Sequence, residues 1–249
     1  MPTAALTVGL PVPKPLRLGE TALFLDLDGT LAPIVARPQD VRPDPRRTRL
    51  LERLVQRLDG RLAVVSGRTL EDIDRILEGC VTPVAAVHGL VLRHADGRIE
   101  STPAHPNFAA AITGFRAFAA LDSGLIVEEK GLSVALHFRL AGRFGPAARA
   151  CAEQLAASTG LILQEGDMVE ELRTPGPDKG ASVRTFMREA PFAGARPVFV
   201  GDDATDEHGF AAAEALGGAG VGVGAVRATQ ARYRLVGVDA ALTWLENAL

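Results

Sequence analysis

Short apolar runs and amphipathic segments alternate along most of the chain. The apolar runs are four or five residues long, as expected for strands buried on both faces of a sheet. Between them, apolar residues recur at helical spacing, as Leu50, Leu54 and Leu58 do, and Asp44 followed by Pro45 marks the start of that helix. This alternation predicts a three-layer, Rossmann-like α/β fold with a parallel sheet. The predicted strands are 21–25, 62–65, 84–87, 197–200 and 221–224.

The middle of the chain follows a different pattern. Two helix–strand–strand units follow one another there, and residues 132–138 alternate in a way that favours an antiparallel sheet with one covered face. We therefore predict that an α+β domain of αββαββ order, residues 104–174, is inserted into the α/β core. The core would comprise residues 19–103 and 175–249, and residues 1–18, interrupted by several prolines, would form a flexible arm.

Composition and charge restrict the possible function classes. The chain has 249 residues, 47% hydrophobic and 23% charged, with a formal net charge of -3. This balance is typical of a folded globular protein, and it lacks the excess of positive charge that is expected of a nucleic-acid-binding protein. No apolar stretch approaches the ~20 residues that cross a bilayer, and the two cysteines lack metal-type spacing. We expect a cytoplasmic monomer with no nucleic-acid or membrane partner.

Polar side chains follow several of the predicted strands. Asp26 and Asp28 come directly after the first strand, and Ser66 follows the second. The acidic segment 202–206 follows a later strand, and Lys179 begins a helix. Because parallel strands end at one edge of a sheet, we expect these groups to converge. Buried carboxylates in one place repel one another, so a cation or a substrate is expected to compensate them.

The residue types in this set indicate phosphoryl transfer. A site with a few carboxylates and room for phosphate oxygens suits a hard cation, with Mg²⁺ as the expected cofactor. Ser66 and Lys179 are of the types that bind phosphate. A carboxylate nucleophile, Mg²⁺ and a lysine are together the parts of a reaction that passes through an aspartyl-phosphate. We expect a small-molecule phosphate ester as the substrate.

Four short motifs occur in this order along the chain: Asp26-x-Asp28-Gly29-Thr30, Ser66, Lys179 and Gly201-Asp202-Asp203-x-Thr205-Asp206. They resemble the four motifs of the haloacid dehalogenase (HAD) superfamily. The inserted αββαββ unit resembles the larger type of cap domain in that superfamily. The resemblance implies a Rossmann-like core with a cap, and phosphate-ester hydrolysis that depends on Mg²⁺.

Six further segments point to one family within this superfamily: Val65-Ser66-Gly67-Arg68, His88-Gly89, Glu128 to Val134, Glu171-Leu172-Arg173, Asp178-Lys179-Gly180 and Gly201 to Glu207. They resemble segments of the trehalose-6-phosphate phosphatase family. Leu27 departs from this family, which often has an aromatic residue there, and Thr174 stands where proline often follows; neither departure removes a reacting group. The resemblance implies hydrolysis of trehalose 6-phosphate to trehalose and phosphate, a step in trehalose biosynthesis.

The resemblance also implies a role for each motif residue. Asp26 would attack the phosphorus, and Asp28 would act first as general acid and then as general base. Ser66 and Lys179 would hold the oxygens of the transferred phosphoryl group. The implied metal ligands are Asp26, the backbone carbonyl of Asp28, and Asp202, with Asp206 in support and Asp203 nearby. The implied sugar-binding residues are Arg68, Glu128, Lys130 and Glu171, the last three from the cap.

Other interpretations of the sequence compete with this one. The same chemistry could act on another sugar phosphate, such as a sucrose phosphate or a hexose phosphate. A catalytically silent chain could bind a sugar phosphate or support a synthase partner, although the intact pair Asp26 and Asp28 argues against silence. Without the resemblance, 128–131 would be an exposed charged turn. His88 and His137 receive no role, because buried structural histidines fit the sequence equally well.

Overall fold

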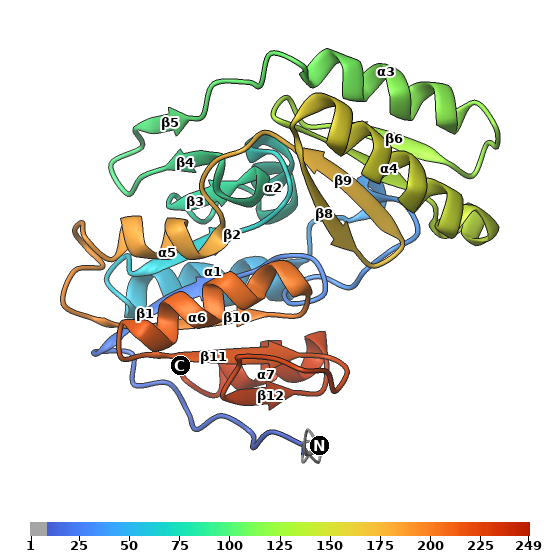
Figure 1. The fold of residues 1–249 in the computed structure, drawn as a ribbon. Coiled ribbons are helices and arrows are strands. Elements are labelled where there is room, and N and C mark those ends of the chain that lie inside the picture. Colours follow the sequence, from blue (N-terminus) through green and yellow to red (C-terminus); the bar gives the residue numbers. More distant parts are fainter. Residues whose placement is uncertain (1–8) are drawn as a thin grey trace, which may run out of the picture.

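The computed structural model describes residues 9–249 and contains two sheets (Figure 1). The larger sheet has eight strands in the order β12-β11-β10-β1-β2-β3-β4-β5. All neighbours from β12 to β3 are parallel, whereas β4 and β5 are added in antiparallel orientation. The strands are β1 Thr21–Leu25, β2 Leu62–Val65, β3 Val84–Ala86, β4 Val91–Arg93, β5 Ile99–Ser101, β10 Arg196–Gly201, β11 Ala219–Val223 and β12 Tyr233–Leu235.

Helices cover both faces of this sheet and make the core a three-layer structure, as predicted. Alternate residues of β1 face opposite layers: Leu23 and Leu25 pack with α1, α2 and α7, whereas Phe24 packs with α5 and α6. Asp44 caps α1 by accepting hydrogen bonds from two backbone amides, with Pro45 at the first helical position. The helices are α1 Pro45–Arg57, α2 Leu70–Leu77, α5 Lys179–Phe186, α6 Glu207–Ala215 and α7 Val238–Glu246.

The smaller sheet belongs to the inserted cap. Its order is β6-β7-β9-β8, it is antiparallel throughout, and α3 and α4 pack on its outer face (Figure 1). Val134, Leu136 and Leu172 join the helices in a separate apolar cluster. The predicted αββαββ order is therefore observed. The elements are α3 Phe108–Ala119, β6 Ile126–Glu129, β7 Ser133–His137, α4 Gly145–Thr159, β8 Ile162–Gly166 and β9 Val169–Arg173.

Three strands of the core sheet were not predicted. The strands β4, β5 and β12 have three residues each, which is too short for a periodic pattern to stand out. The third predicted strand also ends one residue early: Val87 adopts φ of 47° and leaves the sheet after Ala86. Sequence patterns therefore identified the buried middle of the sheet and missed its edges.

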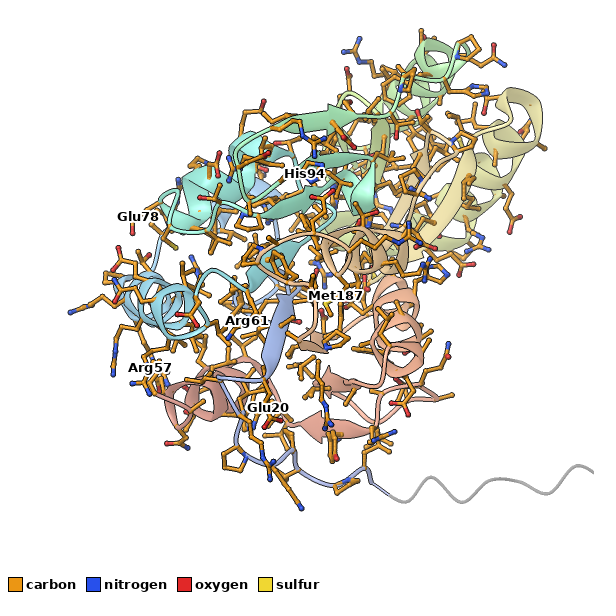
Figure 2. All side chains as sticks on the ribbon, turned by 90° about the vertical axis from the view of Figure 1, so that its left-hand side faces the viewer. Glu20, Arg57, Arg61, Glu78, His94 and Met187 are labelled. Atoms are coloured by element: carbon orange, nitrogen blue, oxygen red, sulfur yellow. The ribbon has the colours of Figure 1, made fainter. Side chains whose placement is uncertain are left out.

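Residues 9–18 of the predicted arm are attached to the core. The Pro11 carbonyl accepts a hydrogen bond of 3.0 Å from the backbone amide of Arg234, and Trp244 Nε1 donates to the Lys14 carbonyl at 3.0 Å. Arg61, labelled in Figure 2 beside β1, donates to the Leu18 carbonyl at 3.1 Å. The described part of the predicted arm thus lies against the core, its flexibility stays a prediction, and residues 1–8 lie outside the described residues. No helix within residues 9–249 is long and apolar enough to span a bilayer.

Candidate active site

The carboxyl edge of the core sheet holds the side chains that were predicted to converge. Asp26 and Asp28 follow β1, and Ser66 follows β2. Asp202 follows β10, and Lys179 is the first residue of α5. All five line one pocket, and residues of the cap sheet line its other side. The structure therefore brings the predicted site residues together from segments far apart in the sequence.

Lys179 lies at the centre of a buried charge cluster. Its Nζ donates hydrogen bonds to Asp26 Oδ1 at 2.8 Å and to Asp206 Oδ1 at 2.6 Å. Burial opposes the lysine charge, but the two aspartates outweigh it and hold the pKa of Lys179 well above its ordinary value. Burial also raises the pKa of Asp26 well above its ordinary value. Attraction to Lys179 lowers this pKa, whereas repulsion from Asp206 and Asp202 raises it further.

Three aspartates are arranged so that one cation could contact them together. Asp26, Asp202 and Asp206 each offer a carboxylate oxygen, and these oxygens lie within 4.8 Å of one another. Burial and the neighbouring carboxylates raise the pKa of Asp202 to about 7, and burial raises that of Asp206 to about 6. A divalent cation would remove this repulsion, so the donor set fits a hard metal ion.

The backbone of the first motif is shaped to allow this close approach. Gly29 has φ of +81°, and a Cβ at this position would lie 2.0 Å from Asp202 Oδ2. No other residue fits there without moving the carboxylate. The Asp-Gly pair therefore does more than form a turn, because it lets the Asp202 carboxylate approach the backbone after β1.

Asp206 is already occupied by protein donors on both of its oxygens. Oδ1 accepts from Lys179, and Oδ2 accepts the backbone amides of Asp202 at 2.8 Å and Asp203 at 3.0 Å. The residue is fully buried. Asp206 therefore fixes both the loop after β10 and Lys179. These contacts fit a supporting role at the metal site better than the role of a main metal ligand.

Arg68 holds Asp28 through two parallel hydrogen bonds. Nε lies 2.6 Å from Oδ2, and Nη2 lies 2.8 Å from Oδ1. Arg68 also donates to the Pro38 carbonyl at 3.0 Å, and its own amide approaches Ser66 Oγ at 3.3 Å. This bidentate geometry fixes the plane of the Asp28 carboxylate. The predicted sugar-binding arginine thus contacts the predicted acid–base residue in this structure.

The cap contributes a second charged cluster on the opposite side of the pocket. Lys130 Nζ lies 2.9 Å from Glu171 Oε2 and 3.8 Å from Glu128 Oε2, and His137 Nε2 lies 2.8 Å from Glu128 Oε2. The side chains of Lys130 and Glu171 are each only 7% exposed, so the lysine does not belong to an exposed turn. Burial disfavours the charge on Glu171, but Lys130 and His88 outweigh it and hold the pKa of Glu171 well below its ordinary value.

This combination of motifs is matched by one protein family over most of the chain. The family model described as trehalose-phosphatase matches residues 24–239. The chain belongs to the trehalose-phosphatase family. The match includes both segments of the core and the whole inserted cap, so both sides of the pocket lie within it.

Curated relatives agree with this membership of the trehalose-phosphatase family. The trehalose-6-phosphate phosphatase of Escherichia coli (strain K12) is 38% identical over 227 residues, which cover 90% of this chain and 85% of the relative. A probable trehalose-phosphate phosphatase of Sinorhizobium fredii is 36% identical over 213 residues, which cover 83% of this chain and 79% of that protein.

Solved structures share the fold. A trehalose-6-phosphate phosphatase related protein superposes with a TM-score of 0.76 at 28% identity and covers 90% of this chain and 95% of its own. The C-terminal domain of the C. albicans trehalose-6-phosphate phosphatase superposes with a TM-score of 0.84 at 19% identity and covers 96% of this chain and 97% of its own, a likeness of fold. A phosphatase of the HAD superfamily from Bacteroides thetaiotaomicron superposes with a TM-score of 0.60 at 16% identity and covers 94% of this chain and 95% of its own, again a likeness of fold.

Several residues that line the pocket were not predicted from the sequence to have a role in it. His88 and His137 line it, as do Gln164 from β8, Arg139 after β7 and Ile34 from the loop after β1. A signal was available for His88, because it follows a predicted strand and precedes a glycine, as the motif residues of the first and second strands do. Ile34 and Gln164 carried no such signal, because only the folded chain brings them to the pocket.

Proposed function

We propose that this protein is a Mg²⁺-dependent phosphatase that hydrolyses trehalose 6-phosphate to trehalose and phosphate. The observation that carries the proposal is a single pocket with two chemically different sides. The core side has the Asp26–Lys179 pair, which suits phosphoryl transfer, and the cap side has the Lys130–Glu171 pair, which suits sugar hydroxyls.

Asp26 is the proposed nucleophile. Its carboxylate oxygen attacks phosphorus, the bond between phosphorus and the sugar oxygen breaks, and Asp28 gives a proton to that oxygen. Asp28 then takes a proton from the water that attacks the aspartyl-phosphate, which releases phosphate and restores Asp26. We propose that Arg68 orients Asp28 for the second step, in which Asp28 starts as a carboxylate whose two oxygens accept the hydrogen bonds of Arg68. Direct contact of Arg68 with the sugar remains a prediction.

Ser66 and Lys179 are the proposed ligands of the phosphoryl oxygens. Both are almost fully buried at the pocket, and Lys179 already contacts the nucleophile at 2.8 Å. A positive charge held at this place stabilises the charge that develops on the oxygens during transfer. It also keeps the Asp26 carboxylate in position for attack.

Mg²⁺ is the proposed metal ion. Asp26, Asp202 and the backbone carbonyl of Asp28 would hold it, while Asp206 acts through Lys179 and the amides after β10. When bound, the ion neutralises the carboxylates and the phosphoryl oxygens of the substrate. The oxygen-only donor set favours Mg²⁺ over softer metals.

Both the core and the cap of this chain contribute residues to the pocket. We propose that the enzyme acts as a monomer. We also propose a cytoplasmic location, because Cys80 and Cys151 are both free thiols.

A panel of phosphate esters tests the proposed substrate. Phosphate release with Mg²⁺ is expected to be fastest, by kcat/KM, for trehalose 6-phosphate, and about 10-fold or more slower for sucrose 6-phosphate and glucose 6-phosphate. The physical reason is that a buried lysine and carboxylate discriminate between sugars by the hydroxyls that pair with them. Faster hydrolysis of another sugar phosphate would favour the alternative substrate, and no release from any ester would favour a silent binding protein.

Replacement of Lys130 by alanine tests the cap assignment. The change is expected to lower kcat/KM for trehalose 6-phosphate about 100-fold, because it removes a sugar contact and leaves Glu171 buried without its partner. Hydrolysis of p-nitrophenyl phosphate, which has no sugar, should fall far less. Arg116→Ala is the matched control, because Arg116 is 66% exposed and pairs with Glu129 on the outside of the cap. Equal losses on both substrates would remove Lys130 from sugar recognition.

A further inference from the structure

A strained turn lies between β3 and β4 at the pocket. Val87, His88 and Gly89 have φ of 47°, 58° and 100°, so three consecutive residues adopt left-handed conformations. For a β-branched residue such as Val87 this conformation is rarely observed. Strained backbone of this kind persists only where surrounding contacts hold it, and it is concentrated at functional sites.

The turn is fixed to the loop that carries Ser66. The His88 amide donates to the Ser66 carbonyl at 2.9 Å, and the Val87 amide donates to the Arg68 carbonyl at 2.9 Å. The imidazole packs directly on Gly67, where a Cβ would lie 2.3 Å from His88 Nε2. The backbone of the turn therefore fixes where this loop lies through two hydrogen bonds, and the imidazole lies against the glycine of the loop.

The same turn also packs against the beginning of α5. A Cβ at Gly89 would lie 2.7 Å from the Asp178 carbonyl and 2.5 Å from Ser182 Oγ. Asp178 directly precedes Lys179 in the sequence, and Ser182 lies three residues after it, in α5. The turn thus contacts both segments that carry the predicted phosphate ligands: the loop after β2, which carries Ser66, and the start of α5, which carries Lys179.

The side chain of His88 extends from this turn to the cap. Its Nε2 lies 3.4 Å from Glu171 Oε2, and Gln164 Nε2 lies 2.9 Å from His88 Nε2 and 3.0 Å from Nδ1. The same Glu171 oxygen accepts from Lys130 at 2.9 Å. His88 is only 8% exposed, so these contacts are sheltered from water. One side chain therefore connects the two sides of the pocket.

We infer that His88 is a positioning residue that aligns the sugar-binding cluster of the cap with the phosphate-binding loops of the core. The inference rests on the proposed function, because it assumes that Glu171 and Lys130 bind the sugar. A substrate that occupies both sides needs the correct distance between them for in-line attack. Misplacement by about 1 Å is enough to slow such a reaction about 100-fold. A phosphate ester without a sugar does not depend on this alignment.

The variants are chosen by backbone conformation. His88→Gly removes the side chain, and glycine adopts φ of 58° without strain. His88→Asn keeps a polar group that can reach Glu171, and asparagine tolerates the left-handed region. Gln164→Ala removes a cap partner of His88 and leaves the strained turn untouched. His208→Asn is the matched control, because that imidazole is 62% exposed on α6.

The experiment measures kcat and KM for trehalose 6-phosphate and for p-nitrophenyl phosphate. We expect His88→Gly to lower the ratio of the two kcat/KM values at least about 10-fold, mainly through kcat for the sugar substrate. Added imidazole should restore part of the loss, His88→Asn and Gln164→Ala should lose less, and His208→Asn should match the original protein. The inference would be overturned if the ratio is unchanged in both His88→Gly and Gln164→Ala, whether or not hydrolysis of the two esters falls equally.

The two proposals fail in different ways. If the original protein does not hydrolyse trehalose 6-phosphate, the proposed function fails before any variant is made. If it does, and the His88→Gly and Gln164→Ala ratios do not move, only the inference about His88 fails. Melting curves of all variants show whether each is folded, and a failure of His88→Gly to fold leaves Gln164→Ala as the deciding variant.

Discussion

Asp26→Asn is expected to reduce turnover of trehalose 6-phosphate by about 10⁴-fold or more and to leave the fold intact. The amide has the size of the carboxylate but is a very poor nucleophile, so the covalent step is lost. Asp26 lies between Lys179 and the acidic residues after β10, and asparagine fills the same space. Steady-state phosphate release and a melting curve measure the two effects.

The fold should survive because the substitution removes a repulsive charge. Burial and nearby carboxylates raise the pKa of Asp26, so the ionised form is destabilised in the metal-free protein. We therefore expect the metal-free variant to melt no lower than the original protein. Asp59→Asn is the control, since this residue is 80% exposed in side chain and its φ of 50° suits asparagine. Substantial phosphate release by Asp26→Asn would exclude Asp26 as the nucleophile.

The core of the fold could be predicted because its strands are buried on both faces. Continuous apolar runs mark β1, β2 and β10, and a polar residue of the site follows each run, directly after β1 and β2 and after one glycine in β10. The position of the site at the carboxyl edge follows from parallel topology alone. For these elements, local pattern and tertiary structure require the same residues, and the prediction was correct.

The contacts within the pocket could not be predicted, because they depend on side-chain geometry across domains. The sequence showed no sign that Arg68 would pair with Asp28, which lies 40 residues away. The contact of His88 with Gln164 and Glu171 requires the cap to lie over the core, and no periodicity encodes that placement. Charge pairing over long sequence separations is decided only in the folded protein.

Removal of divalent metal is expected to abolish turnover, and addition of Mg²⁺ is expected to raise the melting temperature. An ion at about 100 times its dissociation constant adds about 2.7 kcal/mol to the free energy of unfolding. For a chain of this size, that corresponds to a rise of about 5–10 °C. Full activity in excess chelator would remove the metal assignment. Asp202→Asn should lose the thermal response, whereas Asp96→Asn, in an exposed turn, should keep it.

The rise in melting temperature that Mg²⁺ causes should depend on pH. In the metal-free protein, the pKa of Asp202 is about 7 and that of Asp206 about 6, both above the ordinary 3.8. Between pH 3.8 and about pH 7, the folded protein binds more protons than the unfolded chain. The free energy of unfolding of the metal-free protein therefore falls as the pH rises through this range. Mg²⁺ binds the ionised carboxylates and must displace those protons at low pH.

The rise in melting temperature caused by Mg²⁺ is therefore expected to be larger at pH 8 than at pH 5. At pH 8, Asp202 and Asp206 are ionised, and the ion relieves their full repulsion. At pH 5, the protons already relieve much of it, so the ion adds less. Melting curves with chelator and with Mg²⁺ at both pH values measure the difference. An equal rise at the two pH values would show that the ion does not relieve the repulsion in the cluster of Asp202 and Asp206, even if activity requires the ion.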